Sequence, residues 1–145
     1  MLRLSHRPAR DKRISTHVAL VARACGAEGL YYSGYKDGEF EKSVKAVVDR
    51  FGGDFYVRHV NNAVNFVKKK KSEGFYVVHL TMYGLPFEDH TESLKKKKNI
   101  LVIVGGEKVE RIFYDVADLN LSVGSQPHSE VAAVGIFLYL SLIHI

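Results

Sequence analysis

Two short apolar runs, each followed by a polar loop that contains glycine, constrain the fold of this chain more than any other feature. The first run is ILVIV at 100–104, and Gly105-Gly106-Glu107-Lys108 follows it. The second is LNLSV at 119–123, followed by GSQPHSE at 124–130 and the almost wholly apolar VAAVGIFLYL. Short runs rich in β-branched residues are typical of buried parallel strands. Because open α/β sheets bind ligands in the loops that leave such strands, the two loops predict a small-molecule pocket.

The rest of the chain alternates strand and helix patterns, which predicts an α/β fold with a mostly parallel sheet and helices on both faces. No linker divides the 145 residues, so we expect a single domain over 1–145. Thr16 is the expected N-cap of the first helix, and residues 6–13 and 81–86 are expected to be loops. Strands are predicted at 2–4, 30–32, 55–57, 75–80, 100–104 and 119–123, and helices at 18–25, 40–51, 62–71, 88–98, 109–116 and 131–142.

The net charge of +5 and the pI of about 9.3 favour a polyanionic partner, nucleic acid ahead of a membrane surface. An indifferent basic surface would have the same composition. The single cysteine, Cys25, excludes an internal disulfide and fits a reducing cytoplasm. The N-terminus has no apolar signal segment, and the apolar stretch 131–145 is too short to cross a bilayer. Because that stretch ends without a polar cap, we expect the native chain to continue beyond Ile145.

Neither glycine-containing loop has the spacing of a phosphate-binding motif, since G-x-G-x-x-G and G-K-[ST] are both missing. Glu107 would repel a phosphate but suits a cationic ligand, such as the sulfonium of S-adenosylmethionine. A plain strand-to-helix turn is the alternative for this loop. The second loop carries many hydrogen-bonding groups before a helix, and Ser129 or His128 is the expected cap. An ordinary N-cap without a ligand explains that loop equally well.

The seven histidines have no metal-binding spacing and no G-x-S-x-G motif occurs, so we expect neither a metal site nor a hydrolase. The segment 6–13 is strongly basic, with Arg7, Arg10, Lys12 and Arg13. Arginine side chains suit phosphate recognition, although a solvated loop is the alternative. The lysine runs at 68–71 and 95–98 are interpreted as solvated helix ends.

Four blocks of sequence, in this order along the chain, resemble one known family. They are HRP, DKR and THVAL within 6–20, VHLTMYG at 78–84, IVGGEKV at 103–109 and QPHSEVAA at 126–133. These blocks resemble the archaeal tRNA (cytidine-56) 2′-O-methyltransferases of the SPOUT superfamily. The resemblance implies a SPOUT-type fold with a C-terminal trefoil knot, a homodimer with a composite active site, S-adenosylmethionine as cofactor, and the 2′-hydroxyl of a T-loop cytidine of tRNA as substrate.

The resemblance also implies where the cofactor is bound. The expected contacts are Leu80, Gly105, Gly106, Glu107, Lys108, Val109, Val123, Gly124, Ser125, Gln126, Pro127, His128, Ser129 and Glu130. In the wider group of 2′-O-methyltransferases the first motif carries an arginine, but alignment on Gly26 places Leu20 there. A protonated arginine suits holding phosphate and orienting a hydroxyl. We therefore expect Arg13, and after it Arg7, to be the catalytic cations, reaching the cofactor of the partner subunit.

His128 is a weaker candidate for a proton partner. The last helix is too apolar for a one-sided surface helix, so we expect it at a dimer interface with the first helix. Two other functions fit the same residues: a non-catalytic RNA-binding module, and a methyltransferase that acts on another tRNA position or a base nitrogen. The expected partners are tRNA and a second copy of the chain, with no membrane and no metal.

Overall fold

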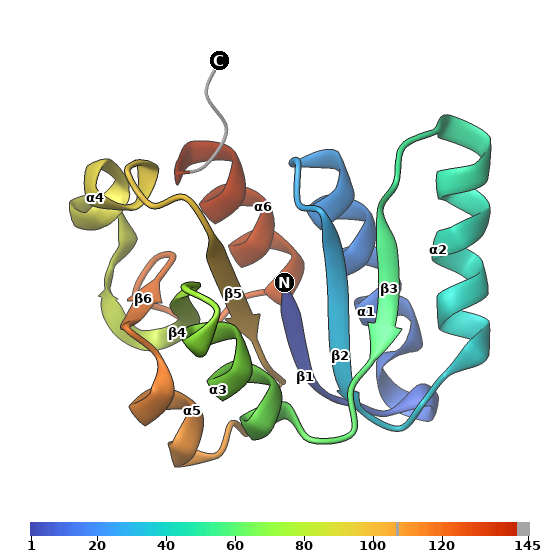
Figure 1. Cartoon of the computed structure of the whole chain (residues 1–145), viewed down its shortest axis with the longest axis horizontal. Coiled ribbons are helices and arrows are strands. Elements are labelled where there is room, and N and C mark those ends of the chain that lie inside the picture. The colour runs from blue at the N-terminus through green and yellow to red at the C-terminus, as the bar shows by residue number, and fades with distance from the viewer. Residues whose placement is uncertain (107, 142–145) are drawn as a thin grey trace.

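The structure is a computed structural model, and it describes residues 1–106 and 108–141. Within them, one parallel sheet has the strand order β3-β2-β1-β5-β4-β6 (Figure 1). The α/β fold expected from the alternating pattern is confirmed. The strands are β1 (Leu2–His6), β2 (Gly29–Gly34), β3 (Tyr56–His59), β4 (Tyr76–Pro86), β5 (Ile100–Val104) and β6 (Leu119–Ser122). The helices are α1 (Pro8–Ala24), α2 (Gly38–Phe51), α3 (Ala63–Ser72), the 3-10 turn η1 (Phe87–His90), α4 (Thr91–Lys95), α5 (Arg111–Val116) and α6 (Glu130–Ser141).

Alternate residues of the strands supply two separate apolar layers, one on each face of the sheet. On one face, Val78, Val102 and Val104 pack with the buried residues of α1, α2, α4 and α6. On the other face, Val77 and Ile103 pack with α3 and α5, which lie in front of the sheet in Figure 1. Because both faces are covered, β5 is apolar throughout, as the sequence pattern indicated.

The strand order places a topological switch between β1 and β5. The connection after β1 leads to β2 on one side, whereas the connection after β5 leads to β6 on the other. Loops that diverge from neighbouring parallel strands leave a crevice at the carboxyl ends of those strands, and open α/β sheets bind ligands there. The ends of β1, β4, β5 and β6 therefore define the region in which a site is expected.

The first helix starts much earlier than the sequence indicated. The loop predicted at 6–13 is wrong, because α1 begins at Pro8, whose fixed φ suits the first helical position. Asp11 supports this start by accepting a hydrogen bond from the backbone N–H of Arg7, at 3.1 Å. Thr16 is not an N-cap: it lies inside α1, and its hydroxyl donates to the Lys12 carbonyl oxygen at 2.8 Å.

The loop predicted at 81–86 is part of β4, which bulges after Leu80 and pairs with β6 again at Leu85. Gly84 permits the return, because a Cβ at this position would lie 2.5 Å from the Asn120 carbonyl oxygen. Smaller differences affect three helices. The one predicted at 88–98 is the short pair η1 and α4, α5 begins at Arg111, and Leu142 of the last helix lies outside the described residues.

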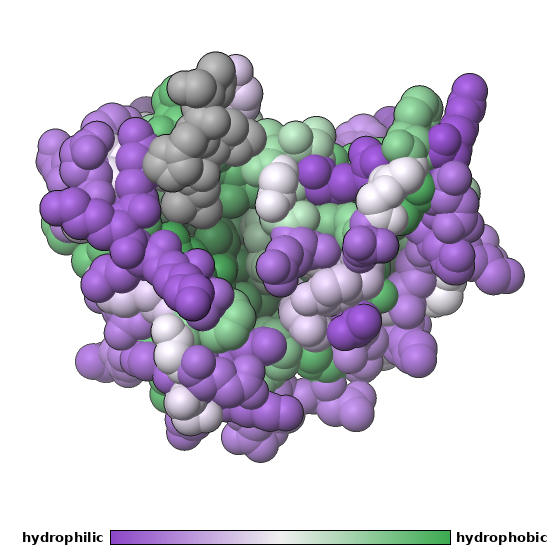
Figure 2. Space-filling view, turned by 45° about the horizontal axis from the view of Figure 1, so that its top comes forward, coloured by the Kyte–Doolittle hydropathy of each residue, from purple (hydrophilic) through white to green (hydrophobic). Residues whose placement is uncertain are grey.

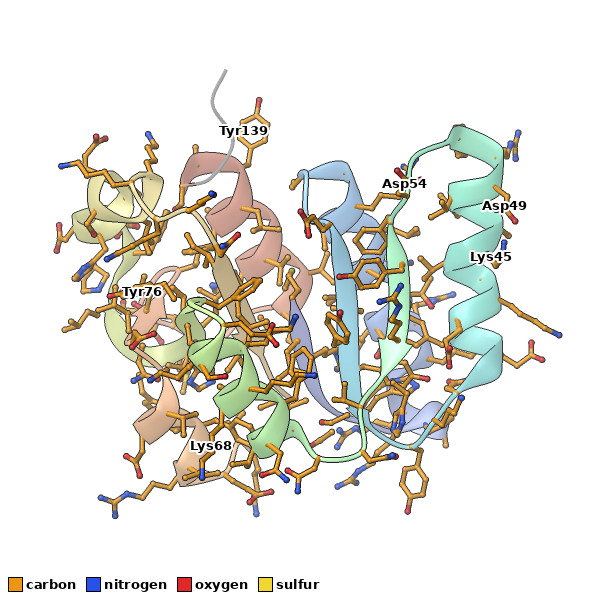
Figure 3. All side chains as sticks on the ribbon, in the orientation of Figure 1. Lys45, Asp49, Asp54, Lys68, Tyr76 and Tyr139 are labelled. Atoms are coloured by element: carbon orange, nitrogen blue, oxygen red, sulfur yellow. The ribbon has the colours of Figure 1, made fainter. Side chains whose placement is uncertain are left out.

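The apolar α6 packs against α1 of its own chain, where Gly135 lets the two helices approach closely. A Cβ on Gly135 would lie 3.2 Å from Cγ1 of Val21. This packing explains part of the apolar character that the sequence assigned to a dimer interface. Ile136, Tyr139 and Leu140 nevertheless remain exposed on α6. Tyr139 projects from the C-terminal part of α6 (Figure 3). The expected dimer contact of this helix remains a prediction.

Candidate functional site

A cavity of about 550 Å³ opens at the carboxyl ends of β4, β5 and β6. Its wall combines the segment after β5, the bulge of β4 and the loop between β6 and α6. The loops singled out in the sequence thus meet at one place. The lining residues are Ile14, His79, Leu80, Thr81, Met82, Tyr83, Val104, Gly105, Gly106, Val109, Tyr114, Val123, Gln126, Pro127, His128, Ser129, Glu130, Val131 and Ala133.

Most of the expected cofactor contacts lie in this wall. The described exceptions are Lys108, Gly124 and Ser125, and Glu107 lies outside the described residues. Those in the wall are Leu80, Gly105, Gly106, Val109, Val123, Gln126, Pro127, His128, Ser129 and Glu130. The sequence did not single out His79, Thr81 or Tyr114. His79 and Thr81 flank Leu80 in the VHLTMYG block, whereas no pattern pointed to Tyr114.

His128 holds the loop between β6 and α6 in a closed shape. Its Nε2 atom is hydrogen-bonded to the carbonyl oxygen of Val123, and its Nδ1 lies 3.1 Å from the carbonyl oxygen of Ser129. Both partners are acceptors, so both ring nitrogens carry hydrogen when both bonds form. These two backbone hydrogen bonds raise the pKa of His128 above its ordinary value. The geometry assigns His128 to loop structure, and Ser129 caps α6 by accepting from the Ala132 N–H at 3.3 Å.

A buried ion-pair network joins this loop to the start of α1. Arg3 on β1 is only 1% exposed, and its Nε and Nη2 donate to the two carboxylate oxygens of Glu130 at 3.0 and 3.1 Å. Arg3 Nη1 also lies 3.7 Å from Asp11, which accepts two hydrogen bonds from Arg10 at 2.8 and 2.9 Å. Burial raises the pKa of Glu130, and the nearby Arg3 only partly offsets this. The hydrogen bond from Arg10 lowers the pKa of Asp11.

The basic residues at the start of α1 occupy different surroundings. Arg7 and Arg13 are exposed, and within the described residues neither lines the cavity. Arg10 instead lies beside it, because a Cβ on Gly106 would be 3.5 Å from Arg10 Nη2. The fold of one chain therefore brings Arg10 to the glycine loop and leaves the two expected catalytic arginines on the surface.

The fully buried His6 is the last residue of β1, and it joins that strand to α1 and to the start of α2. Its Nδ1 lies 2.6 Å from Ser15 Oγ on α1, and its Nε2 lies 2.9 Å from Asp37 Oδ2 at the start of α2. Burial acts to raise the pKa of Asp37, but the His6 hydrogen bond and others lower it overall. A serine, a histidine and an aspartate in contact suggest hydrolase chemistry. Here His6 and Ser15 have no exposed surface, and no member of the cluster lines the cavity, so the cluster is structural.

A second cavity, of about 390 Å³, opens at the opposite, amino-terminal edge of the sheet. Figure 2 shows this face, with an apolar hollow bordered by polar side chains. Tyr31, Tyr56 and Leu94 contribute to its wall, together with four lysines, Lys70, Lys95, Lys97 and Lys98. Because ligands of open α/β sheets bind at the carboxyl ends of strands, we place the candidate site in the larger cavity.

Residues 1–106 and 108–141 contain no group of three or more histidine, cysteine or acidic side chains arranged to hold a metal ion. In the same residues no helix is both long and apolar enough to cross a membrane.

Comparisons with known proteins decide the family. A sequence profile described as "tRNA ribose 2'-O-methyltransferase, aTrm56" matches residues 51–143. The tRNA (cytidine(56)-2'-O)-methyltransferase of Archaeoglobus fulgidus is 51% identical over 138 residues, which are 95% of this chain and 79% of the relative. The enzyme of the same name from Metallosphaera sedula is 49% identical over 139 residues, again 95% and 79%. The chain belongs to this family. The resemblance seen in the four sequence blocks is therefore confirmed.

Solved structures show that this chain has the fold of the TrmH/SpoU methyltransferases. The TrmH/SpoU tRNA modifying enzyme of A. aeolicus superimposes with a TM-score of 0.72 at 19% identity, covering 97% of this chain and 71% of that one. The SpoU methyltransferase AviRb from Streptomyces viridochromogenes, in complex with the cofactor AdoMet, gives a TM-score of 0.66 at 19% identity, with coverages of 97% and 56%. At these identities the likeness concerns the fold, and the trefoil knot of the C-terminal third remains a prediction.

Proposed function

We propose that this protein transfers the methyl group of S-adenosylmethionine to the ribose 2′-oxygen of cytidine-56 in the T-loop of tRNA. The observation that carries the proposal is the cavity at the carboxyl ends of β4, β5 and β6, where most of the expected cofactor contacts meet. Membership of the tRNA ribose 2′-O-methyltransferase family supplies the reaction and the substrate class. The net charge of +5 is consistent with a polyanionic substrate.

The residues present fit this cofactor. Val104, Val109 and Tyr114 offer an apolar and aromatic surface for a purine base. Gly105 and Gly106 allow a ligand to approach the backbone, since they carry no side chain. The loop at 123–130 contributes hydroxyl, amide and carboxylate groups near the start of α6, where backbone N–H groups are free to bind polar parts of a ligand.

The reaction needs a positioned hydroxyl more than a powerful base. When bound, the cofactor supplies an electrophilic methyl group: the C–S bond breaks, a C–O bond forms, and the 2′-hydroxyl proton leaves to solvent or to a nearby base. The protein gains rate by holding the ribose oxygen in line with that methyl group. Arg13 and Arg7 are proposed to bind the phosphates that flank the cytidine and to orient its hydroxyl, because guanidinium groups match phosphate oxygens.

We propose that these arginines act on the cavity of a partner subunit. Arg7 and Arg13 are exposed at the start of α1 and lie outside the wall of their own cavity among the described residues. The exposed apolar residues of α6, Ile136, Tyr139 and Leu140, supply a surface on which a second copy can pack. Light scattering at micromolar concentration is expected to give a dimer, and a monomer would contradict this part of the proposal. A cytoplasmic location, which we also propose, fits a role in tRNA modification.

Arginine variants test the proposal directly. Methyl transfer from labelled S-adenosylmethionine to unmodified tRNA is measured for Arg7→Ala, Arg13→Ala and the control Arg50→Ala on α2, together with tRNA binding. We expect Arg13→Ala to lower turnover at least 100-fold, because positioning contributes several kcal/mol to such reactions. Arg7→Ala is expected to weaken tRNA binding and turnover together. Near-normal turnover in both variants would contradict the assignment of these residues.

A further inference from the structure

His79 is a buried polar residue in the wall of the candidate cofactor cavity. It lies on β4, directly before Leu80, and has no exposed surface. Its ring packs in a T-shaped arrangement with Tyr114, another wall residue, with ring centroids 4.7 Å apart. A histidine in such surroundings normally has both ring nitrogens hydrogen-bonded, because a buried polar atom without a partner destabilises the fold.

One of the two ring nitrogens is fixed by β6. His79 Nδ1 lies 2.9 Å from Asn120 Oδ1, and Asn120 Nδ2 donates to the Tyr114 carbonyl oxygen at 3.0 Å. The second bond fixes the orientation of the amide, so its oxygen faces His79. An amide oxygen only accepts, and therefore Nδ1 carries the hydrogen. Burial also lowers the pKa of His79, which keeps the ring neutral. In this tautomer Nε2 is an acceptor with a free lone pair.

The Nε2 atom has no hydrogen-bond partner within the described residues, although it is fully buried. It points away from Asn120, since the two nitrogens lie on opposite sides of the ring carbon between them. The cavity wall to which His79 belongs is otherwise largely apolar and aromatic, with Leu80, Val104, Val109 and Tyr114. An acceptor in an apolar wall selects a ligand with a flat apolar body and an N–H at its edge.

We infer that His79 Nε2 accepts a hydrogen bond from the exocyclic amine of the cofactor's adenine and so determines specificity for that base. This inference rests on the proposed function, because it assumes that the cavity holds S-adenosylmethionine. Adenine is the flat apolar part of that molecule, and its N–H donors are on the exocyclic amine. The ribose hydroxyls and the ammonium group need a more polar wall, which the loop at 123–130 provides. His79 is thus a specificity residue and takes no part in methyl transfer.

The test compares two ligands on two proteins by isothermal titration calorimetry. The ligands are S-adenosylhomocysteine and S-inosylhomocysteine, whose base carries an oxygen in place of the amine. The variant is His79→Asn, because the asparagine amide reproduces Nδ1–H toward Asn120 but has no atom equivalent to Nε2. The discrimination is the dissociation constant of the inosine ligand divided by that of the adenine ligand. We expect it to be about tenfold larger for wild type than for His79→Asn, because in wild type the inosine oxygen would face Nε2 and oppose two acceptors.

Two controls separate this effect from a structural one. Ser141→Ala removes another buried polar atom without a described partner, Ser141 Oγ on α6, and is expected to leave the ligand preference unchanged. The ¹⁵N chemical shift of His79 Nε2 in wild type needs no variant. It is expected to change on adding S-adenosylhomocysteine and to stay that of a free acceptor with S-inosylhomocysteine.

The outcomes are distinguishable. If wild type and His79→Asn discriminate equally between the two ligands, the role of His79 is refuted while the cofactor site stands. The 2′-deoxyribose analogue of S-adenosylhomocysteine is titrated as a third ligand. If His79→Asn changes the discrimination against this analogue and not against the inosine ligand, the inference is also overturned, because the partner of Nε2 would be a hydroxyl. If wild type binds neither ligand, both the inference and the proposed function fail.

Discussion

Removing the Arg3 guanidinium is expected to destabilise the protein strongly. In Arg3→Met the apolar stem is retained, but Glu130 loses hydrogen bonds at 3.0 and 3.1 Å and Asp11 loses a cation at 3.7 Å. Charge-assisted bonds of this kind contribute roughly 1.5–3 kcal/mol each. Breaking a buried pair by removing one partner costs about 3–5 kcal/mol, because the other charge stays buried. Asp11 keeps its two bonds from Arg10, so we expect a loss of about 3–5 kcal/mol.

The free energy of unfolding lost in Arg3→Met should depend on pH, and the loss should be larger at neutral than at acidic pH. Burial already raises the pKa of Glu130, and without Arg3 nothing offsets that effect, so the folded-state pKa rises further. A group whose folded pKa lies above its unfolded value stabilises the fold below the unfolded pKa, and that stability is lost as the pH rises through the folded pKa. The deficit of Arg3→Met is therefore largest at pH 7 and shrinks as the pH falls toward 4.5, the ordinary value for glutamate.

Urea denaturation at pH 7 and pH 5, at one fixed protein concentration, measures this deficit. The double variant Arg3→Met/Glu130→Leu is the matched control, because replacing a whole buried pair by apolar groups is often neutral. It should recover most of the lost free energy of unfolding. A deficit below about 1 kcal/mol at pH 7, the level of an exposed ion pair, would refute the reasoning. So would a double variant no more stable than the single one.

Three further predictions concern single side chains. Gly84→Ala should lower the free energy of unfolding by about 1–3 kcal/mol in urea denaturation, since the new Cβ would lie 2.5 Å from the Asn120 carbonyl oxygen. Gly38→Ala, with nothing within 4 Å, should not. The protection of loop amides at 123–129, that is the intrinsic base-catalysed exchange rate divided by the observed rate, should fall as the pH rises through the raised pKa of His128, above its ordinary 6.5, because deprotonation removes a donor. In His128→Ala this protection should be low and should no longer change with pH. His6→Ala should destabilise the fold by on the order of 3 kcal/mol in thermal or urea unfolding, because it leaves a buried hydroxyl and a buried carboxylate without their partner.

The sheet was predictable from the sequence because strands such as β4 and β5 carry buried apolar residues on both faces. ILVIV at 100–104 and LNLSV at 119–123 are apolar runs that need cover from helices, and the glycine-containing loops after them mark strand ends. The carboxyl-edge cavity follows from that alternation alone. Its residues could be named only through the family blocks, since glycine and serine loops of this composition also occur as plain turns.

Other parts of the structure could not be predicted, because they depend on contacts between residues far apart in the chain. The start of α1 at Pro8 was missed because its basic residues read as a solvated loop, whereas Asp11 is buried and paired with Arg3 and Arg10. The β4 bulge was missed because Gly84 resembles a turn glycine, yet it is needed where β6 passes close by. His79 gave no signal of its own, since its role depends on Asn120 and Tyr114, which follow it by 41 and 35 residues.

The most direct test of the central claim is to map the methyl group on the product. Unmodified tRNA is incubated with the protein and S-adenosylmethionine labelled in the methyl group, and the digested RNA is analysed by mass spectrometry and by resistance of the phosphodiester after the modified nucleotide to alkaline cleavage. The proposed function predicts one labelled methyl group per tRNA, on the 2′-oxygen of cytidine-56. Label on a base nitrogen, label at another nucleotide, or tRNA binding without any transfer of label would contradict it.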